Sequence, residues 1–166
     1  LKKPKGNLVW FHACSVGELK SILPIIKNFE KNKKINNILI TTSTLSSSKV
    51  YAKFGFKKTI HQFFPIDTVY LTNKFLNQWK PNKIIFVESE IWPNMLLNIK
   101  KRKIPLILLN ARITKKTFLK WKKINYFSKN IFLIFNKIFP QNKETKNFLN
   151  KLGIKNTKII GNLKYC

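Results

Sequence analysis

Short apolar runs alternate with longer segments of helical period along most of the chain. The runs that suit buried strands are residues 8–11, 38–40, 84–87, 106–109 and 158–160, with weaker ones at 59–61 and 138–139. The segments with helical spacing are residues 19–29, 69–76, 95–99, 118–127 and 145–152. This alternation is typical of an α/β fold with a parallel sheet covered by helices on both faces. We therefore predict a Rossmann-like domain of six or seven strands.

Two local signals mark helix ends within this pattern. Gly153 follows the last helical segment, where a glycine commonly forms the C-terminal cap. Residues 41–48 are rich in Ser and Thr and follow a predicted strand. Because such hydroxyls cap helix N-termini, we expect a helix to start within this segment.

Composition limits the domain count and the kind of partner. With 166 residues, 44% of them hydrophobic, residues 1–166 can form one core and are expected to be a single domain. Lys and Arg number 33 and Asp and Glu 6, so 33 − 6 gives a net charge of +27. This charge indicates either a polyanionic partner or the Lys, Asn and Ile bias of an AT-rich genome. Arg102 and Arg112 are the only arginines, which disfavours specific nucleic-acid recognition.

Cysteine, histidine and hydropathy exclude several classes of site. Cys14 and Cys166 are too few for a disulfide framework or a zinc site, and reduced thiols are expected. His12 and His61 are too far apart in sequence to suggest a metal site, so we predict no metal. No window has the roughly 18 consecutive apolar residues of a membrane-spanning helix.

The first of two acidic turns, residues 15–18, follows the first predicted strand and precedes a helix. Ser15 and Glu18 have the spacing of a capping box, in which both side chains bind backbone N–H groups. Gly17 would permit a tight turn or the close approach of a ligand. The helix N-terminus could also bind phosphate. Capping and ligand binding are both open interpretations of this turn.

The second acidic turn, residues 88–94, follows the strand at 84–87. Glu88 comes at the end of a strand expected to be buried, where a carboxylate is costly unless it is paired or functional. Glu90 could instead complement a helix dipole, and Pro93 suits a first helical turn. We interpret Glu88 as a functional residue.

The carboxyl ends of parallel strands share one edge of a sheet, so Glu18 and Glu88 should border the same crevice. A carboxylate pair there could raise one pKa and supply a base matched to neutral pH. Arg112 follows the strand at 106–109 and could add an anion-binding guanidinium, or form a surface salt bridge.

Four strings make the chain similar to the N-terminal half of the 3-deoxy-D-manno-octulosonic acid (Kdo) transferases of lipopolysaccharide synthesis. They are WFHACSVGE at 10–18, VESEIWPN at 87–94, LNAR at 109–112 and GNLKY at 161–165. Their order and spacing agree with the family over nearly the whole chain. A Thr44-Leu45-Ser46 turn stands where the family has a Pro-Thr-Gly-like one.

The resemblance implies the N-terminal half of a GT-B glycosyltransferase, which faces a cleft and binds the lipid A precursor. It implies Glu18 as general base and a second essential carboxylate at Glu88. From their positions at the same turns and sheet edge, we expect Ser15, Gly17, Glu90 and Arg112 to bind the acceptor. It further implies inverting transfer from the donor CMP-Kdo, without metal or cofactor, at the cytoplasmic face of the bacterial inner membrane. The family's N-terminal anchor and C-terminal donor-binding domain have no counterpart in these 166 residues, so we expect the chain alone to be inactive.

Two other functions remain as alternatives. A nucleic-acid-binding domain driven by the net charge would show a steep salt dependence, although no common nucleic-acid motif is present. A catalytically silent domain could instead hold an anionic membrane surface through lysines and aromatic residues.

Overall fold

The computed structural model describes residues 5–88 and 90–161. Six parallel strands form one sheet in the order β3-β2-β1-β4-β5-β6. The strands are β1 (Leu8–His12), β2 (Asn37–Thr42), β3 (Thr59–Phe63), β4 (Lys83–Val87), β5 (Leu106–Ala111) and β6 (Lys137–Pro140). The predicted α/β fold with a Rossmann-like parallel sheet is confirmed.

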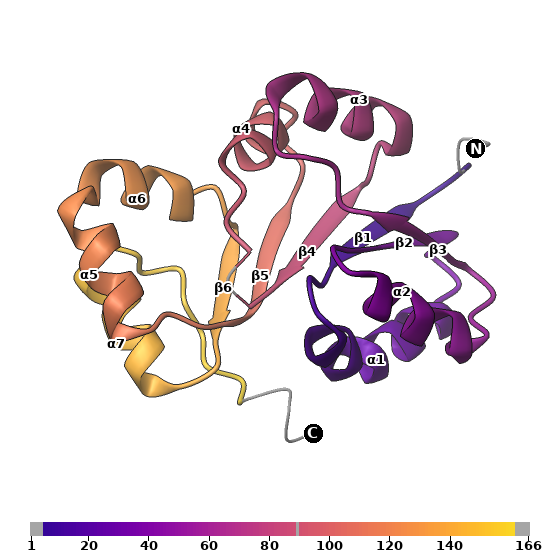
Figure 1. The fold of residues 1–166 in the computed structure, drawn as a ribbon, viewed down its shortest axis with the longest axis horizontal. Helices are drawn as coiled ribbons and strands as arrows, with labels where there is room; N and C mark the ends of the chain where they lie inside the picture. Colours follow the sequence, from indigo (N-terminus) through magenta and orange to yellow (C-terminus); the bar gives the residue numbers. More distant parts are fainter. Residues whose placement is uncertain (1–4, 89, 162–166) are drawn as a thin grey trace.

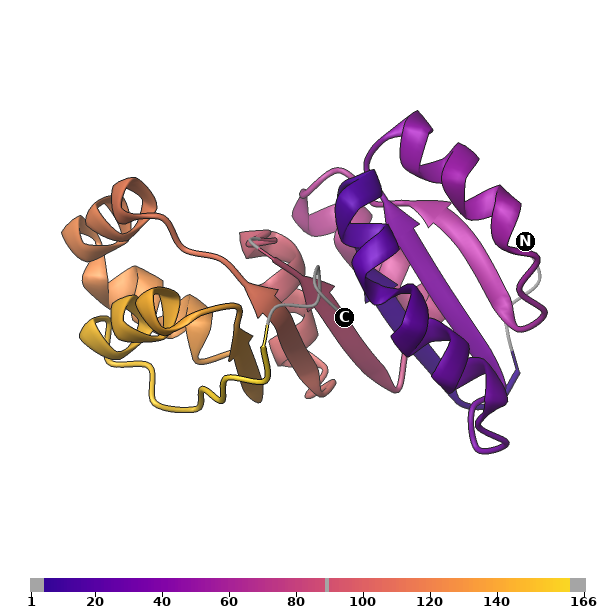
Figure 2. The same cartoon turned by 90° about the horizontal axis from the view of Figure 1, so that it is seen from below.

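Helices connect the strands and cover both faces of the sheet (Figure 1). They are α1 (Val16–Lys31), α2 (Leu45–Tyr51), α3 (Val69–Trp79), α4 (Pro93–Lys101), α5 (Lys115–Lys123), α6 (Asn125–Phe132) and α7 (Lys143–Lys151), with a 3-10 turn at Ala52–Phe54. Helices α1 and α2 lie on one face, and α3, α4 and α6 lie on the other. Seen from below, α5, α6 and α7 gather at the end of the molecule remote from α1 (Figure 2).

Polar side chains at the strand-to-helix turns explain where several helices begin. At Ser15, Thr44, Thr68, Thr114 and Asn142 a side-chain oxygen accepts a backbone N–H from the residue three positions later. Such caps satisfy N–H groups that have no partner within the helix. Thr44 confirms the expected helix start within residues 41–48. Gly153, at φ +80°, confirms the predicted C-terminal cap of α7.

The sheet separates two hydrophobic clusters. One side buries Val9, Phe11, Ile38, Ile40 and Val87 against α1. The other side buries the alternate strand residues against α3, α4, α5, α6 and α7. Because both faces are covered, the strands are apolar throughout rather than alternating with polar residues.

The predicted strand at residues 158–160 is not formed. Only Thr157 bridges to β6, opposite Ile138, and the Ile138 backbone bonds to Asn156 and Lys158. The next β6 residue that faces this side is Pro140, which has no N–H to donate. The pairing therefore stops after one rung, and the sheet has six strands in the described part of the chain.

The helix predicted at residues 118–127 is two helices, α5 and α6. Ile124 leaves the helical region, at φ −113° and ψ 42°. The Trp121 carbonyl accepts hydrogen bonds from the Ile124 N–H and from the Ser128 hydroxyl. These bonds replace the helical bond from residue 125, so the chain turns between the two helices.

The strand order reverses between β1 and β4, since β2 and β3 extend from one side of β1 while β5 and β6 extend beyond β4. In open α/β sheets, ligands bind outside the carboxyl ends of the strands at such a reversal. Both acidic turns follow these two strands. None of the helices in residues 5–88 and 90–161 is long and apolar enough to cross a bilayer.

Candidate active site

Three of the six acidic residues have structural positions outside the two acidic turns, and the other three lie in those turns. Glu30 accepts the backbone N–H groups of Lys57 and Lys58. Asp67 accepts the N–H groups of Asn94 and Met95 and so caps α4. Glu144 lies in the first turn of α7. The remaining three are Glu18, Glu88 and Glu90.

The Glu18 carboxylate is held by the turn that precedes its own helix. One oxygen, Oε2, accepts the Cys14 N–H at 2.9 Å, and Oε1 accepts the Ser15 hydroxyl at 3.0 Å. The Ser15 oxygen in turn accepts the Glu18 N–H at 3.3 Å. The residue is 8% exposed. This is a variant of the predicted capping box, and it fixes the carboxylate at the edge of the sheet.

Burial raises the pKa of Glu18 from 4.5 to about 7. This pKa already includes the smaller raising effects of the Glu90 and Glu88 charges and the lowering effects of the bonds from Cys14 and Ser15. Since charges interact appreciably only at short range, the three carboxylates lie close together, as the topology predicts. A carboxyl that titrates near neutral pH can accept a proton from a reacting group.

Gly17 is exposed beside Glu18, and its backbone does not require a glycine. Its φ is not positive, and an added Cβ would meet only the Ser15 oxygen, at 3.9 Å. The backbone conformation at this position is therefore open to residues other than glycine. What Gly17 leaves is open space next to the carboxylate.

Glu88 and Asn110 are both in the left-handed backbone region at the ends of adjacent strands. Their φ angles are 62° and 55°. The Glu88 N–H donates to the carbonyl of Leu109 at 2.8 Å, which keeps the two strand ends together. Asn110 is 1% exposed, and its side-chain amide forms no hydrogen bond with the described part of the chain. Strained backbone at adjacent strand ends is characteristic of functional sites.

The strain at Glu88 predicts an unusual order of stability for two variants. Glu88→Gly should be more stable than Glu88→Ala by about 1 kcal/mol, because glycine adopts positive φ without a Cβ clash. Urea unfolding of the two variants measures the difference. At Glu30, inside α1, the same pair should show the opposite order, because glycine disfavours a helix. Equal stabilities at position 88 would contradict the strain.

Glu90 belongs to a hydrogen-bonded network that joins the two acidic turns. Its Oε2 contacts His12 Nε2 at 3.0 Å and accepts the indole N–H of Trp92 at 2.6 Å. His12 Nδ1 lies 3.0 Å from the Thr41 hydroxyl, which accepts the Trp10 indole N–H at 2.8 Å. The contacts with Glu90 and with the Thr41 hydroxyl are both hydrogen bonds when His12 donates from Nε2 and the Thr41 hydroxyl donates to Nδ1. The network holds the β4–α4 turn against β1.

A cavity of about 230 Å³ lies on the β5 side of Glu88. Its polar lining includes Glu88, Arg112 and Thr117, and its walls are mostly apolar. The apolar lining residues are Ile91, Leu108, Ala111, Ile113, Trp121 and Phe132. The arrangement suits a ligand with an anionic group and an apolar body.

Glu88 is thus the link between two groups of predicted site residues. Ser15, Gly17 and Glu18 lie in one turn, and the charges of Glu88 and Glu90 act on Glu18. Arg112 lies beyond Glu88, on the cavity. The sequence did not indicate the network of His12 and Thr41 or the buried amide of Asn110. Residues 5–88 and 90–161 contain no group of three side chains that could hold a metal ion.

Comparison with solved structures defines the class of fold. The chain superimposes on a UDP-N-acetylglucosamine 2-epimerase from Rickettsia bellii with a TM-score of 0.66 and 18% identity, over 96% of this chain and 46% of that one. The UDP-GlcNAc 2-epimerase from Neisseria meningitidis matches equally well, with a TM-score of 0.66, 15% identity and 96% and 47% coverage. The domain therefore has the Rossmann-like architecture of the N-terminal half of a GT-B fold.

Sequence comparison then gives the family. Residues 1–166 match the model of the 3-deoxy-D-manno-octulosonic-acid transferase (kdotransferase) family. The Rickettsia felis Kdo transferase is 40% identical over 96% of this chain and 34% of its own length. The Haemophilus influenzae enzyme is 29% identical over 98% of this chain and 38% of its own length. The chain belongs to the Kdo transferase family of glycosyltransferases and spans about a third of the length of these relatives.

Proposed function

We propose that the protein to which this chain belongs transfers Kdo from CMP-Kdo to a lipid A precursor, with Glu18 as the general base. The observation that supports this most strongly is the pKa of Glu18, which burial and two neighbouring carboxylates raise to about 7. A base with this pKa is matched to proton abstraction near neutral pH.

In the proposed reaction, a sugar hydroxyl of the acceptor lies beside Glu18, in the space that Gly17 leaves open. The hydroxyl oxygen attacks the anomeric carbon of Kdo and its proton passes to the Glu18 carboxylate. The bond between the anomeric carbon and the CMP phosphate oxygen breaks, and CMP leaves with the bonding electrons. The attack inverts the anomeric centre and needs no metal ion, as in the family that the chain resembles.

The other site residues orient the base and the acceptor. Ser15 holds Glu18 through its hydroxyl. Glu88 and Arg112 line one cavity, where they would bind the polar part of the acceptor. Glu90, expected from the sequence to bind acceptor, has one oxygen engaged by His12 and Trp92. We assign Glu90 mainly to raising the pKa of Glu18 and to joining the two turns.

The remaining parts of the proposal concern the whole protein. The N-terminal acceptor half would act with a donor half that binds CMP-Kdo, at the cytoplasmic face of the bacterial inner membrane. Specific nucleic-acid binding is not part of this function.

A transfer assay tests the proposal. CMP-Kdo and a lipid A precursor are incubated with the chain alone and with a full-length transferase carrying these 166 residues, and the mass of the lipid product is measured by mass spectrometry. The full-length protein should add Kdo, and the chain alone should not, because the donor would have no binding half. Absence of transfer by the full-length protein would refute the proposed function, and robust transfer by the chain alone would refute the division of roles.

The open space at Gly17 predicts a variant that separates activity from stability. Gly17→Ala should leave the fold intact, or stabilise it by up to about 1 kcal/mol, because alanine favours a helix and meets no close atom. The same methyl group should obstruct the acceptor and raise its KM in the full-length transferase. Thermal unfolding and steady-state kinetics measure the two effects. Unchanged kinetics would show that the acceptor does not approach Gly17.

A further inference from the structure

Helices α5 and α6 form an exposed surface that combines large apolar side chains with lysines. We call it the α5–α6 face. Its exposed apolar residues are Leu119, Ile124, Tyr126, Phe127 and Leu133. Its exposed lysines are Lys115, Lys116, Lys120, Lys122, Lys123 and Lys129. None of these apolar residues or lysines belongs to the candidate active site around Glu18 and Glu88.

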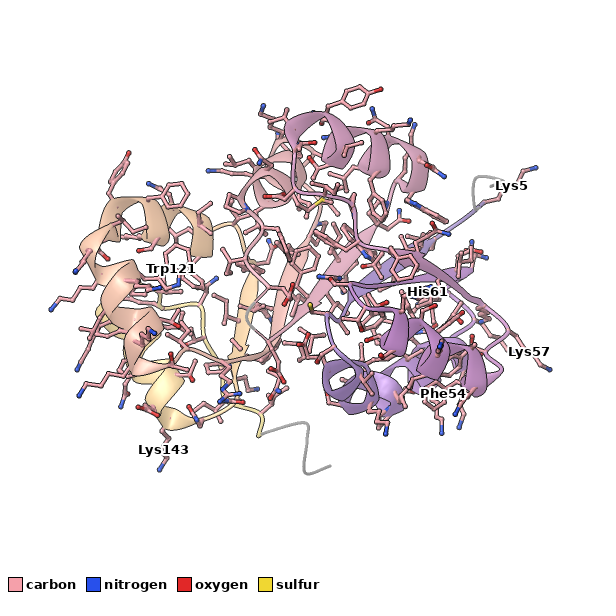
Figure 3. The ribbon with its side chains drawn as sticks, in the orientation of Figure 1. Lys5, Phe54, Lys57, His61, Trp121 and Lys143 are labelled. Carbon is pink, nitrogen blue, oxygen red and sulfur yellow. The ribbon has the colours of Figure 1, made fainter. Side chains whose placement is uncertain are left out.

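The apolar residues of this face are not needed for the core, because both helices already bury their other side. Phe118 stacks on Phe148 of α7 with ring centroids 4.6 Å apart. Trp121, labelled in Figure 3, packs edge-on against Phe132 of α6 at 5.7 Å. By contrast, Tyr126 is 86% exposed. An exposed cluster of this kind marks an interaction surface rather than unfinished packing.

The charge of this face favours an anionic partner. Residues 91–143 contain no Asp or Glu, so no carboxylate on α4, α5 or α6 offsets the six lysines. Lysines elsewhere also project into solvent, such as Lys57 and Lys143 in Figure 3. On α5 and α6, however, exposed lysines occur on the same two helices as exposed aliphatic and aromatic side chains.

We propose that the α5–α6 face binds the surface of a bilayer that contains anionic phospholipids. Lysines attract the lipid head groups, and Leu119, Ile124, Tyr126 and Phe127 enter the boundary between head groups and acyl chains. Aliphatic side chains gain little from nucleic acid, which binds through phosphates and base stacking. The mixture of aliphatic groups and lysines therefore favours lipid over RNA.

The α5–α6 face lies close to the candidate active site, and the role inferred from this position rests on the proposed function. Thr117, Trp121 and Phe132, from the inner sides of the same two helices, line the cavity that also contains Glu88 and Arg112. Docking the outer side on a bilayer would therefore hold this cavity one helix layer from the lipid. An acceptor embedded in that bilayer would have a short path to the site.

Vesicle sedimentation of the 166-residue chain tests the proposal. The chain should sediment with vesicles of phosphatidylglycerol and phosphatidylcholine and remain largely unbound with phosphatidylcholine alone. The double variant Lys122→Gln/Lys123→Gln should lower the partition coefficient by about 30-fold, since each lysine near an anionic surface contributes about a factor of five. Tyr126→Ser/Phe127→Ser should lower it by about tenfold or more through lost apolar insertion.

Two matched controls separate this face from the general charge of the chain. Lys33→Gln/Lys34→Gln removes the same charge from the exposed turn between α1 and β2. Ile66→Ser/Tyr70→Ser removes similar apolar groups, 73% and 72% exposed, next to and at the start of α3. Both controls should bind within about twofold of the unchanged chain, and circular dichroism should show that all four variants fold.

Equal losses in a test pair and its control would overturn the proposal, because binding would then follow net charge or any apolar patch. Equal affinity for neutral vesicles would also overturn it. A competition with single-stranded RNA gives a third test. If RNA displaced the chain from the vesicles at a phosphate concentration below that of the lipid, nucleic acid would be the preferred partner and the proposal would be overturned.

Kinetics of a full-length transferase distinguish this proposal from the proposed function. The Lys122→Gln/Lys123→Gln variant should lose activity on acceptor embedded in anionic vesicles, yet act normally on deacylated, water-soluble acceptor. Equal activity of variant and parent on embedded acceptor would refute the role of the face while leaving Kdo transfer intact. Absence of transfer to either acceptor by the parent would instead refute the proposed function.

Discussion

Glu18→Gln in a full-length transferase should reduce kcat/KM for Kdo transfer by about 10²–10⁴-fold, the usual contribution of a general base. Glutamine has nearly the same size, and its single carbonyl oxygen can still accept the Cys14 N–H, while its NH2 group can donate to the Ser15 oxygen. It cannot take up a proton from the acceptor. Steady-state transfer rates at pH 8 measure the effect, and circular dichroism checks the fold.

Glu30→Gln is the matched control, because Glu30 also accepts two backbone N–H groups but lies far from the reversal of the sheet. Its transfer rate should match that of the parent. If Glu18→Gln retained more than about a tenth of the parent rate, the assignment of Glu18 as the base would fail.

The pKa of Glu18 also predicts two pH effects of opposite sign. A base is active when deprotonated, so kcat/KM should rise with pH and level off above about 7. Folding raises this pKa from 4.5, so the folded state binds the proton more tightly than the unfolded state. The contribution of Glu18 to stability is therefore greatest below pH 4.5 and is lost as the pH rises through about 7. Relative to Glu18→Gln, the parent should become less stable over that range.

Glu88→Gln should lower transfer by about 10²-fold, because Glu88 borders both the base and the cavity that contains Arg112. The loss should appear as a raised KM for acceptor together with a lower kcat, since the carboxylate would both bind and position the sugar. Initial rates over a range of acceptor concentrations separate the two parameters.

The pH at which kcat/KM rises provides a second readout for Glu88→Gln. Removal of one negative charge should shift the rising limb of kcat/KM to lower pH, because the charge of Glu88 raises the pKa of Glu18. A purely structural role for Glu88 would lower the rate without moving that limb. An unchanged transfer rate would contradict the role assigned to Glu88, and so would an unchanged pH for the rise of kcat/KM.

The arrangement of strands and turns could be predicted from local features of the sequence. Apolar runs indicated all six strands, and Ser15 and the residues of 41–48 indicated where α1 and α2 begin. The prediction of a strand at 158–160 was wrong. Its apolar residues do not indicate which strand it would pair with, and in β6, its neighbour, Pro140 has no N–H to donate to a further pair. The break at Ile124 depends on the Ser128 hydroxyl, which binds the Trp121 carbonyl only in the folded chain.

The candidate site could be predicted only in part, because it combines residues from separate strands. Position after a strand was enough to bring Glu18 and Glu88 to one edge of the sheet. The contact of His12 with Glu90 joins residues 78 positions apart, and only the three-dimensional structure reveals it. Likewise, a positive φ at Glu88 has no sequence signal, since glutamate rarely adopts it.

Titration of the Glu18 carboxyl by carbon-13 NMR tests the central claim most directly. In the folded chain its midpoint should lie near pH 7, and in Glu90→Gln it should move to lower pH, since Glu90 is the stronger of the two carboxylate influences. A midpoint near 4.5 that Glu90→Gln leaves unchanged would mean that the carboxylates do not act on one another, and the proposed base would be lost.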